Sequence, residues 1–133
     1  MRVASLFSGI GGMDLALEQA GMQVVVQVEN NPVCNRVLAR HWPNVRRLGD
    51  VRKVSGSELG AVDLVCGGFP CQDLSTAGRR TGLAGTRSVL WWEFHRLLSE
   101  CRPRWCIIEN VPGLLSSNYG RDMGTILWAL GDL

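Results

Sequence analysis

Short apolar segments typical of β-strands alternate with segments of helical periodicity along this chain. Strands are expected at residues 3–7, 23–28, 45–48, 61–66 and 105–108. Helices are expected at residues 13–20, from 32 onward, at 88–101 and at 120–133. A chain that alternates strand and helix about five times is typical of a doubly wound, mostly parallel sheet with helices on both faces. We therefore predict an α/β fold.

The size and composition of the chain fit one globular domain and exclude several other classes. Its 133 residues suit a single hydrophobic core, and 46% hydrophobic with 20% charged residues argue against disorder. No apolar run approaches the roughly 20 residues that cross a bilayer, so no membrane association is expected. The N-terminus carries no signal-peptide pattern, which predicts a cytoplasmic protein. The formal net charge of +2 is too small to indicate a nucleic-acid partner by itself.

The cysteines predict neither a disulfide framework nor a metal centre. There are five of them, an odd number, and they form no C-x-x-C pair, so a zinc knuckle is not expected. Most of them are expected to be buried small hydrophobic residues, and no bound metal ion is predicted.

A glycine-rich turn connects the first expected strand to the first expected helix. Its sequence is Phe7-Ser8-Gly9-Ile10-Gly11-Gly12. Glycines let the backbone turn sharply and let a ligand approach the free N–H groups of a helix N-terminus, which favour an anion. The spacing is not G-x-G-x-x-G, which disfavours a dinucleotide. A pyrophosphate, the carboxylate of an amino-acid-like cofactor and a purely structural role all remain compatible with the turn.

Acidic residues follow two further strands. Glu29 ends the second strand and Asp50 follows the third. The carboxyl ends of parallel strands share one edge of the sheet, and a carboxylate there can accept hydrogen bonds from ribose hydroxyls. Each acid alone also fits a solvated strand end, but the two together favour a cofactor that contains a nucleoside.

A cysteine lies immediately after the fourth strand, in the segment Gly67-Gly68-Phe69-Pro70-Cys71-Gln72. The thiolate is the nucleophilic form, so a site built on Cys71 has to remove the thiol proton. His41 and His95 fall in expected helices, where surface or packing roles suit them better than a Cys–His pair. Glu109, at the end of the fifth strand, can hydrogen-bond or protonate a ring nitrogen of a substrate. A charge that caps the sheet edge is the alternative role for Glu109.

In this order, these motifs resemble those of the cytosine-C5 DNA methyltransferases. The resemblance extends from Val3 to about Gly113. Its most specific part is the Pro70-Cys71 loop combined with Glu109-Asn110-Val111. It implies a Rossmann-like fold of the S-adenosylmethionine-dependent methyltransferase type, with residues 1–133 as the catalytic and cofactor-binding domain.

The resemblance also implies a role for each matching residue. Cys71 would add to C6 of cytosine, and Glu109 would hold N3 and the exocyclic amine. Phe7 would stack on the adenine of S-adenosylmethionine, Glu29 would bind its ribose hydroxyls, and Asp50 would contact the adenine edge. The full set of expected cofactor-binding residues is Phe7, Ser8, Gly9, Ile10, Gly11, Gly12, Glu29, Asn30, Asp50, Val51, Pro70 and Leu90.

The implied substrate is double-stranded DNA, from which the target cytosine has to flip out of the stack before attack. Gln72, Ser75 and Arg87 are expected to contact the DNA. They belong to a long loop over residues 72–87 that matches the mobile catalytic loop of the family. Arg79 and Arg80 in this loop fit phosphate contacts and a solvated basic loop equally well.

The family pattern continues beyond the last residue of this sequence. A later Gln-Arg-rich motif, the target-recognition domain and the helix that completes the cofactor pocket have no counterpart here, so the fold is expected to be incomplete at its C-terminal end. One expectation is a second polypeptide that carries these parts. If the chain is a fragment, its last strand and tail helix are expected to leave an unpaired sheet edge and exposed apolar surface. The alternatives are an inactive S-adenosylmethionine-binding fragment and, less favoured, an RNA cytosine methyltransferase.

Overall fold

The computed structural model of the protein describes residues 1–70 and 89–133. The strands are β1 (Arg2–Leu6), β2 (Gln23–Val28), β3 (Arg46–Leu48), β4 (Leu64–Gly67) and β5 (Trp105–Ile108). The α-helices are α1 (Gly12–Gln19), α2 (Pro32–His41), α3 (Gly56–Leu59), α4 (Val89–Cys101) and α5 (Arg121–Gly131). Short 3-10 helices cover η1 (Val51–Lys53), η3 (Pro112–Leu115) and η4 (Ser117–Gly120).

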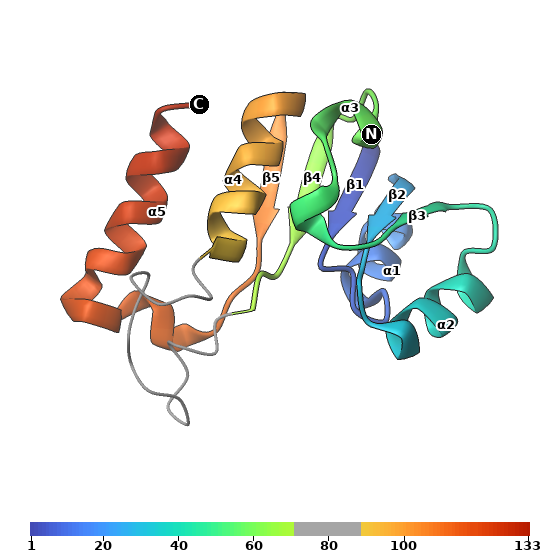
Figure 1. Ribbon diagram of the computed structural model, residues 1–133, viewed down its shortest axis with the longest axis horizontal. Coiled ribbons are helices and arrows are strands. Elements are labelled where there is room, and N and C mark those ends of the chain that lie inside the picture. The colour runs from blue at the N-terminus through green and yellow to red at the C-terminus, as the bar shows by residue number, and fades with distance from the viewer. Residues whose placement is uncertain (71–88) are drawn as a thin grey trace.

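The strands of the described residues form one parallel sheet in the order β3-β2-β1-β4-β5 (Figure 1). The chain begins at the centre with β1, builds outward through β2 and β3, and then returns to the other side of β1. The direction of winding therefore reverses between β1 and β4. Ligands of open parallel sheets bind outside the carboxyl ends of the strands at such a reversal. The predicted α/β fold, a doubly wound parallel sheet, is confirmed.

Apolar layers cover both faces of the sheet. The larger layer joins the strands to the buried side of α4, which carries Trp91, Phe94, Leu97 and Leu98. The smaller layer, under α1, consists of Val3, Leu17, Val24, Leu64 and Cys66. Complete burial of a large apolar side chain stabilises a fold by roughly 1.5–3 kcal/mol, so these layers hold the helices against the sheet.

A bulge in β2 decides which of its side chains face α1. Val3 pairs with Val24, whereas Ala4 pairs with Val26, so Val25 is an extra residue in the ladder. Side chains alternate between the two faces of a strand, and one extra residue changes the phase of this alternation. Gln27 consequently shares a face with its pairing partner Ser5. Both polar side chains are directed into the layer beneath α1.

The predicted element positions agree with the structure except in a few places. β4 begins at Leu64 instead of 61. Asp63, just before it, bonds the start of β1: its N–H donates to Arg2 O, and its carboxylate accepts from Arg2 N–H. The four-residue α3 and the 3-10 helices were not predicted, since segments this short show no helical period. Leu127, expected on the buried side of the last helix, is 57% exposed. The loop expected over residues 72–87 lies outside the described residues.

The outer edge of β5 has no neighbouring strand among the described residues. Trp105 and Ile107 lie on the face that α1 covers nearer the centre, and they are 60% and 40% exposed. α5 packs on the opposite face, where its Ile126 and Ala129 are buried. The expected open edge with exposed apolar surface is therefore present. No described helix has both the length and the apolar character needed to cross a bilayer.

Candidate functional site

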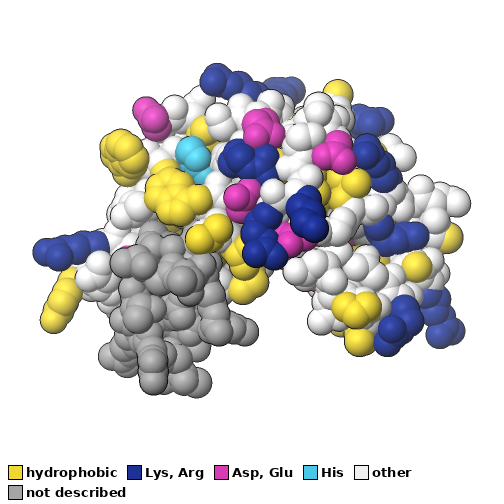
Figure 2. All heavy atoms as spheres, in the orientation of Figure 1, with side chains coloured by type: hydrophobic (Ala, Val, Ile, Leu, Met, Phe, Trp, Pro, Cys, Tyr) yellow, Lys and Arg dark blue, Asp and Glu magenta, His cyan; other side chains and the backbone are white. Residues whose placement is uncertain are grey.

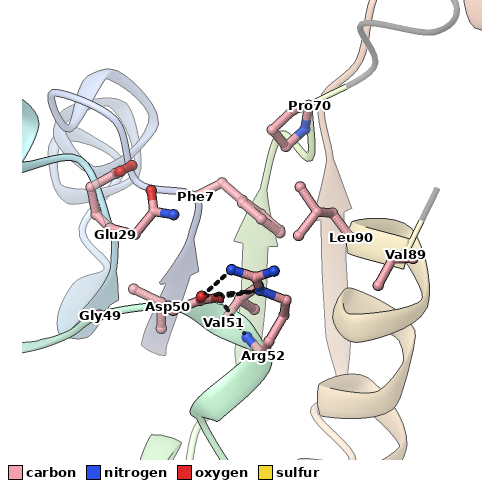
Figure 3. A pocket seen from close by; sticks show the side chains of 11 residues that line it. Phe7, Glu29, Gly49, Asp50, Val51, Arg52, Pro70, Val89 and Leu90 are labelled. Atoms are coloured by element: carbon pink, nitrogen blue, oxygen red, sulfur yellow. Dashed lines mark hydrogen bonds and ion pairs between the residues drawn. The ribbon is translucent and has the colours of Figure 1, made fainter. Parts of the chain in front are cut away.

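A crevice lies beside the carboxyl ends of β1, β2 and β3 and the first turn of α4 (Figure 3). Its volume is about 350 Å³. The sequence-predicted residues that line it are Phe7, Glu29, Asn30, Asp50, Val51, Pro70 and Leu90. The fold thus brings side chains from separate stretches of sequence to one cavity, at the position where parallel sheets bind ligands.

Glu29 is fixed at the crevice by two backbone N–H groups. Its Oε2 accepts a hydrogen bond from Gly9 N–H at 2.8 Å, and its Oε1 accepts one from Asn31 N–H at 2.7 Å. These bonds join the end of β2 to the glycine turn and to the start of α2, which the Asn31 side chain caps. Each carboxylate oxygen has two lone pairs, so Glu29 can still accept hydrogen bonds from ligand hydroxyls.

Asp50 is bonded by Arg52, a crevice residue that was not predicted from the sequence (Figure 3). Its Oδ1 accepts hydrogen bonds from Arg52 N–H and Nε at 3.0 and 2.9 Å. Its Oδ2 accepts from Nε and Nη2 at 3.0 and 2.5 Å. Hydrogen bonds from the side chain and backbone of Arg52 lower the pKa of Asp50 to about 2, so the carboxylate is charged at neutral pH.

Helix α4 holds the segment that carries Asp50. Arg96 Nη2 donates to Val54 O at 2.8 Å and to Val51 O at 3.2 Å. The remaining guanidinium nitrogens of Arg96 pair with Glu93 and Glu100, each at 2.8 Å. Because Arg96 bonds both carbonyl groups and carboxylates, it fixes η1 against α4 and with it one wall of the crevice.

Phe7 supplies the aromatic wall of the crevice. Its backbone has a φ of 53°, in the left-handed region that non-glycine residues rarely adopt. The Phe7 ring is nearly parallel to that of Phe94, with centroids 6.4 Å apart, and Phe94 in turn stacks on Trp91. Phe94 and Trp91 are fully buried. Strained backbone of this kind persists where packing fixes it, and it clusters at ligand sites.

The glycine turn contributes only in part to this crevice. Gly9 is joined to it through Glu29, and the Ser8 hydroxyl donates to Ser5 O at 3.0 Å. Ile10, Gly11 and Gly12 instead line a separate hollow between α1 and α2. Gly11 has a φ of 89°, and a Cβ there would lie 2.4 Å from the Trp42 ring, so packing alone requires glycine at this position.

Glu109 lies against the backbone of Gly68, where the strand ends of β4 and β5 meet. A Cβ on residue 68 would come within 2.4 Å of Glu109 Oε2. Glu109 N–H donates to Gly67 O at 3.0 Å, and the Asn110 side-chain amide donates to Phe69 O at 3.2 Å. The predicted acid is therefore adjacent to the segment that leads to Pro70, and it is exposed and open to a substrate.

The predicted nucleophile Cys71 and the predicted DNA-binding residues Gln72, Ser75 and Arg87 lie outside the described residues. Their roles stay predictions. Pro70, which precedes Cys71 directly, lines the crevice.

The cysteines of the described ranges are free. Burial raises the pKa of Cys66 to about 12, and it also raises the pKa values of Cys101 and Cys106. Since the thiolate is the attacking form, the buried Cys66 is unsuited to covalent catalysis. The expectation that most cysteines are buried is wrong for the described residues: Cys66 is buried, Cys34 and Cys101 are half-buried, and Cys106 is exposed. Cys106 lies on the edge strand β5, beside a hollow that α5 does not fill.

A buried polar cluster lies under the strand ends, on the α1 side of the sheet. Asp14 is fully buried and accepts hydrogen bonds from the Ser5 hydroxyl at 2.5 Å and from Gln27 Nε2 at 2.7 Å. Burial raises the pKa of Asp14. The cluster ties α1 to β1 and β2 next to the residues that enter the crevice. Within the described residues, no three His, Cys, Asp or Glu side chains gather as metal ligands.

Sequence reasoning missed several residues that shape this site. Val28, Gly49 and Val89 line the crevice and each directly precedes a predicted residue. A rule that includes the neighbours of a strand-end acid could have found Val28 and Gly49, but not Val89, which begins α4. Arg52 is only two positions from Asp50, but its contact with the Asp50 carboxylate depends on the rotamer of the arginine side chain, which the sequence does not indicate. Phe94 and Arg96 act from behind the wall, and their positions on α4 match ordinary core and surface residues.

The whole chain, residues 1–133, matches the model of the family C-5 cytosine-specific DNA methylase. Type II methyltransferase M2.BsuMI of Bacillus subtilis is 41% identical over 100% of this chain and 35% of its own length. Type II methyltransferase M.Eco47II of Escherichia coli is 39% identical over 98% of this chain and 32% of its own length. The chain therefore spans about a third of the length of these curated relatives.

Solved structures share the fold. A candidate DNA modification methyltransferase encoded within an E. coli prophage superposes with a TM-score of 0.82 and 27% identity, over 99% of this chain and 38% of that one. DNMT2 of Spodoptera frugiperda, at 22% identity, gives a TM-score of 0.75 over 98% of this chain and 40% of that one, which supports the fold alone. By its full-length match and by its fold, the chain belongs to the C-5 cytosine-specific DNA methylase family.

Proposed function

We propose that residues 1–133 form the catalytic portion of a DNA (cytosine-5)-methyltransferase whose crevice binds S-adenosylmethionine, the methyl donor of this family. The observation that carries the proposal is the convergence of Phe7, Glu29 and Asp50 on one crevice beside the strand ends that lead to Cys71 and Glu109. Family membership over the whole chain supports it.

The crevice residues fit this cofactor chemically. The Phe7 ring offers a flat apolar surface for a purine, and the charged Asp50 carboxylate is an acceptor for an amine on the purine edge. Glu29 keeps acceptor positions for ribose hydroxyls, and Pro70 and Leu90 add apolar contact. A volume of about 350 Å³ falls within the range of small-molecule sites, roughly 300–1,000 Å³.

The chemistry would divide between the cofactor and the protein. Bound S-adenosylmethionine supplies an electrophilic methyl group. Cys71 would form a bond to C6 of a flipped-out cytosine, which moves electron density onto C5, while Glu109 stabilises this density through N3. C5 would then take the methyl group, with S-adenosylhomocysteine as the leaving group. Transfer of the C5 proton to a base would finally expel the Cys71 thiolate and leave 5-methylcytosine.

A duplex containing 5-fluorocytosine tests the nucleophile, because fluorine at C5 cannot leave as a proton does and the adduct persists. We expect a denaturation-resistant complex with the parent chain and with Cys106→Ser, which alters a cysteine exposed on β5. We expect none with Cys71→Ser. An adduct that survives Cys71→Ser, or no adduct from protein that binds the DNA, would contradict the proposal. An adduct with transfer RNA in place of DNA would favour an RNA substrate.

We further propose that a second polypeptide carries the remainder of the enzyme and packs against the open side of β5. The exposed Trp105 and Ile107 and the unpaired strand edge support a protein partner there. The chain also matches 54% of the length of Type II methyltransferase M.AquIA of Picosynechococcus, against 35% of M2.BsuMI, so family chains differ widely in length. Copurification of this chain with the part of M2.BsuMI that the chain does not match, about two thirds of that protein, tests whether such a complex forms. Trp105→Lys is expected to abolish the complex, and a complex that tolerates this change would contradict the placement.

A further inference from the structure

Both oxygens of the Asp50 carboxylate accept hydrogen bonds from one residue. Arg52 donates to Oδ1 from its backbone N–H and to Oδ2 from Nη2, and the single hydrogen on its Nε is shared between the two oxygens. The planar guanidinium thus covers both oxygens at once, the bidentate arrangement of arginine and carboxylate. A second donor therefore has to compete with the Arg52 side chain for Asp50.

This ion pair lies inside the crevice and not on a remote surface. Asp50 and Arg52 both line the cavity, together with Phe7 and Leu90 (Figure 3). The Asp50 side chain is 19% exposed, whereas that of Arg52 is 60% exposed. The acid is thus fixed within the wall, and the arginine reaches it from the solvent side, where it has room to leave.

The surroundings of Arg52 leave room for its departure. Its side chain is 60% exposed, so water can hydrate the guanidinium once it has left Asp50. A second carboxylate, that of Glu93 on α4, also attracts the Arg52 guanidinium, although less strongly than Asp50 does. Figure 2 shows acidic and basic side chains interleaved near the centre of this face of the molecule. A released guanidinium therefore remains in a favourable electrostatic environment.

We propose that Arg52 gates the adenine end of the crevice: its guanidinium occupies Asp50 in the empty protein and has to swing away before Asp50 accepts a hydrogen bond from the exocyclic amine of the cofactor. This inference rests on the proposed binding of S-adenosylmethionine. Arg52 is in this view a competitor of the ligand and not one of its contacts.

The gate makes a prediction opposite to that for an ordinary binding-site residue. Arg52→Ala should tighten the binding of S-adenosylhomocysteine, the product that retains the adenine, about 1.5- to 5-fold, which corresponds to the energy range of an exposed ion pair. Arg52→Lys, which keeps the charge but lacks the planar fork, should give a smaller gain. Arg46→Ala is the matched control, because Arg46 is 55% exposed, pairs with Glu58 and lies on β3 outside the crevice.

The test is calorimetric titration of the four chains with S-adenosylhomocysteine and with its analogue that lacks the 6-amino group. The gate predicts that Arg52→Ala tightens the first ligand and leaves the second unchanged, since only the amine competes for Asp50. Unchanged or weaker binding of S-adenosylhomocysteine by Arg52→Ala would overturn the gate, and so would an equal gain for both ligands. If the parent and Arg46→Ala, both folded, bound neither ligand, the proposed cofactor site itself would fail and the gate with it.

Discussion

The Glu109 carboxylate packs against Gly68 so closely that a Cβ on residue 68 would lie 2.4 Å from Glu109 Oε2. The backbone of Gly68 is not in the left-handed region, so alanine meets no backbone strain there and the conflict is only with the acid. The position of the proposed catalytic acid at the end of β5 therefore depends on a missing side chain at the end of β4.

Gly68→Ala is expected to displace the Glu109 carboxyl group and to reduce methyl transfer or adduct formation by at least tenfold. A positioned acid contributes about 10²- to 10⁴-fold, and a displaced one loses part of that. Cofactor affinity should change less than twofold, because Gly68 does not line the crevice. Gly124→Ala on α5, where a Cβ meets nothing within 4 Å, is the control and should leave both quantities unchanged. Full activity of Gly68→Ala would remove Glu109 from the reaction.

Glu29→Ala is expected to weaken S-adenosylmethionine binding by roughly 1.5–3 kcal/mol, the contribution of hydrogen bonds to a charged group. The variant loses the ribose acceptor and also the bond that orders Gly9 N–H. Equilibrium dialysis with labelled cofactor measures the change. Asp132→Ala, which removes an exposed acid after α5, is the control of equal charge. An unchanged dissociation constant for Glu29→Ala would exclude this residue from the ribose site.

Phe94→Leu is expected to lower both stability and cofactor affinity, since the buried Phe94 ring supports Phe7 from behind. An aromatic pair contributes about 0.5–1.5 kcal/mol beyond its burial, which sets the expected loss of unfolding free energy attributable to the pair. Affinity for S-adenosylhomocysteine should fall severalfold. Leu97→Val, another fully buried residue of α4, should reduce stability without the loss of affinity. Equal effects of the two variants on affinity would contradict a specific role for Phe94.

Asp14 and Asp50 should make stability depend on pH in opposite directions. Burial raises the pKa of Asp14 above 3.8, so its folded form binds a proton more readily than its unfolded form. Its contribution is complete below pH 3.8 and is lost as pH rises through the raised pKa. The pKa of Asp50 is lowered from 3.8 to about 2, so its contribution is present above pH 3.8 and is lost as pH falls toward 2.

Urea unfolding at a series of pH values between about 2.5 and 7 measures the free energy of unfolding in both pH ranges and so separates the contributions of the two acids. Asp14→Asn should remove the decline of stability with rising pH above 3.8, whereas Asp50→Asn should remove only the loss below 3.8. A decline above pH 3.8 that persists in Asp14→Asn would show that another group causes it.

The sequence predicts the strand ends well because apolar runs and the acids or glycines that follow them are local signals. Glu29, Asp50 and Pro70 reach one crevice for this reason: parallel strands place their carboxyl ends along one edge. The contact between Arg52 and Asp50 was not predictable, since it depends on side-chain rotamers. The stack of Phe7 on Phe94 joins residues far apart in the chain, and the bulge at Val25 follows from pairing with β1. Interactions of these kinds leave no periodic pattern in the sequence, so they could not be predicted from it.

The central claim is methyl transfer through Cys71, and transfer of labelled methyl from S-adenosylmethionine to mixed-sequence duplex DNA tests it most directly. The folded parent chain should place label on C5 of cytosine, recovered as 5-methylcytosine after hydrolysis of the DNA, and Cys71→Ser should place none. Equal labelling by both proteins, or no labelling by parent protein that binds the cofactor and the DNA, would contradict the account.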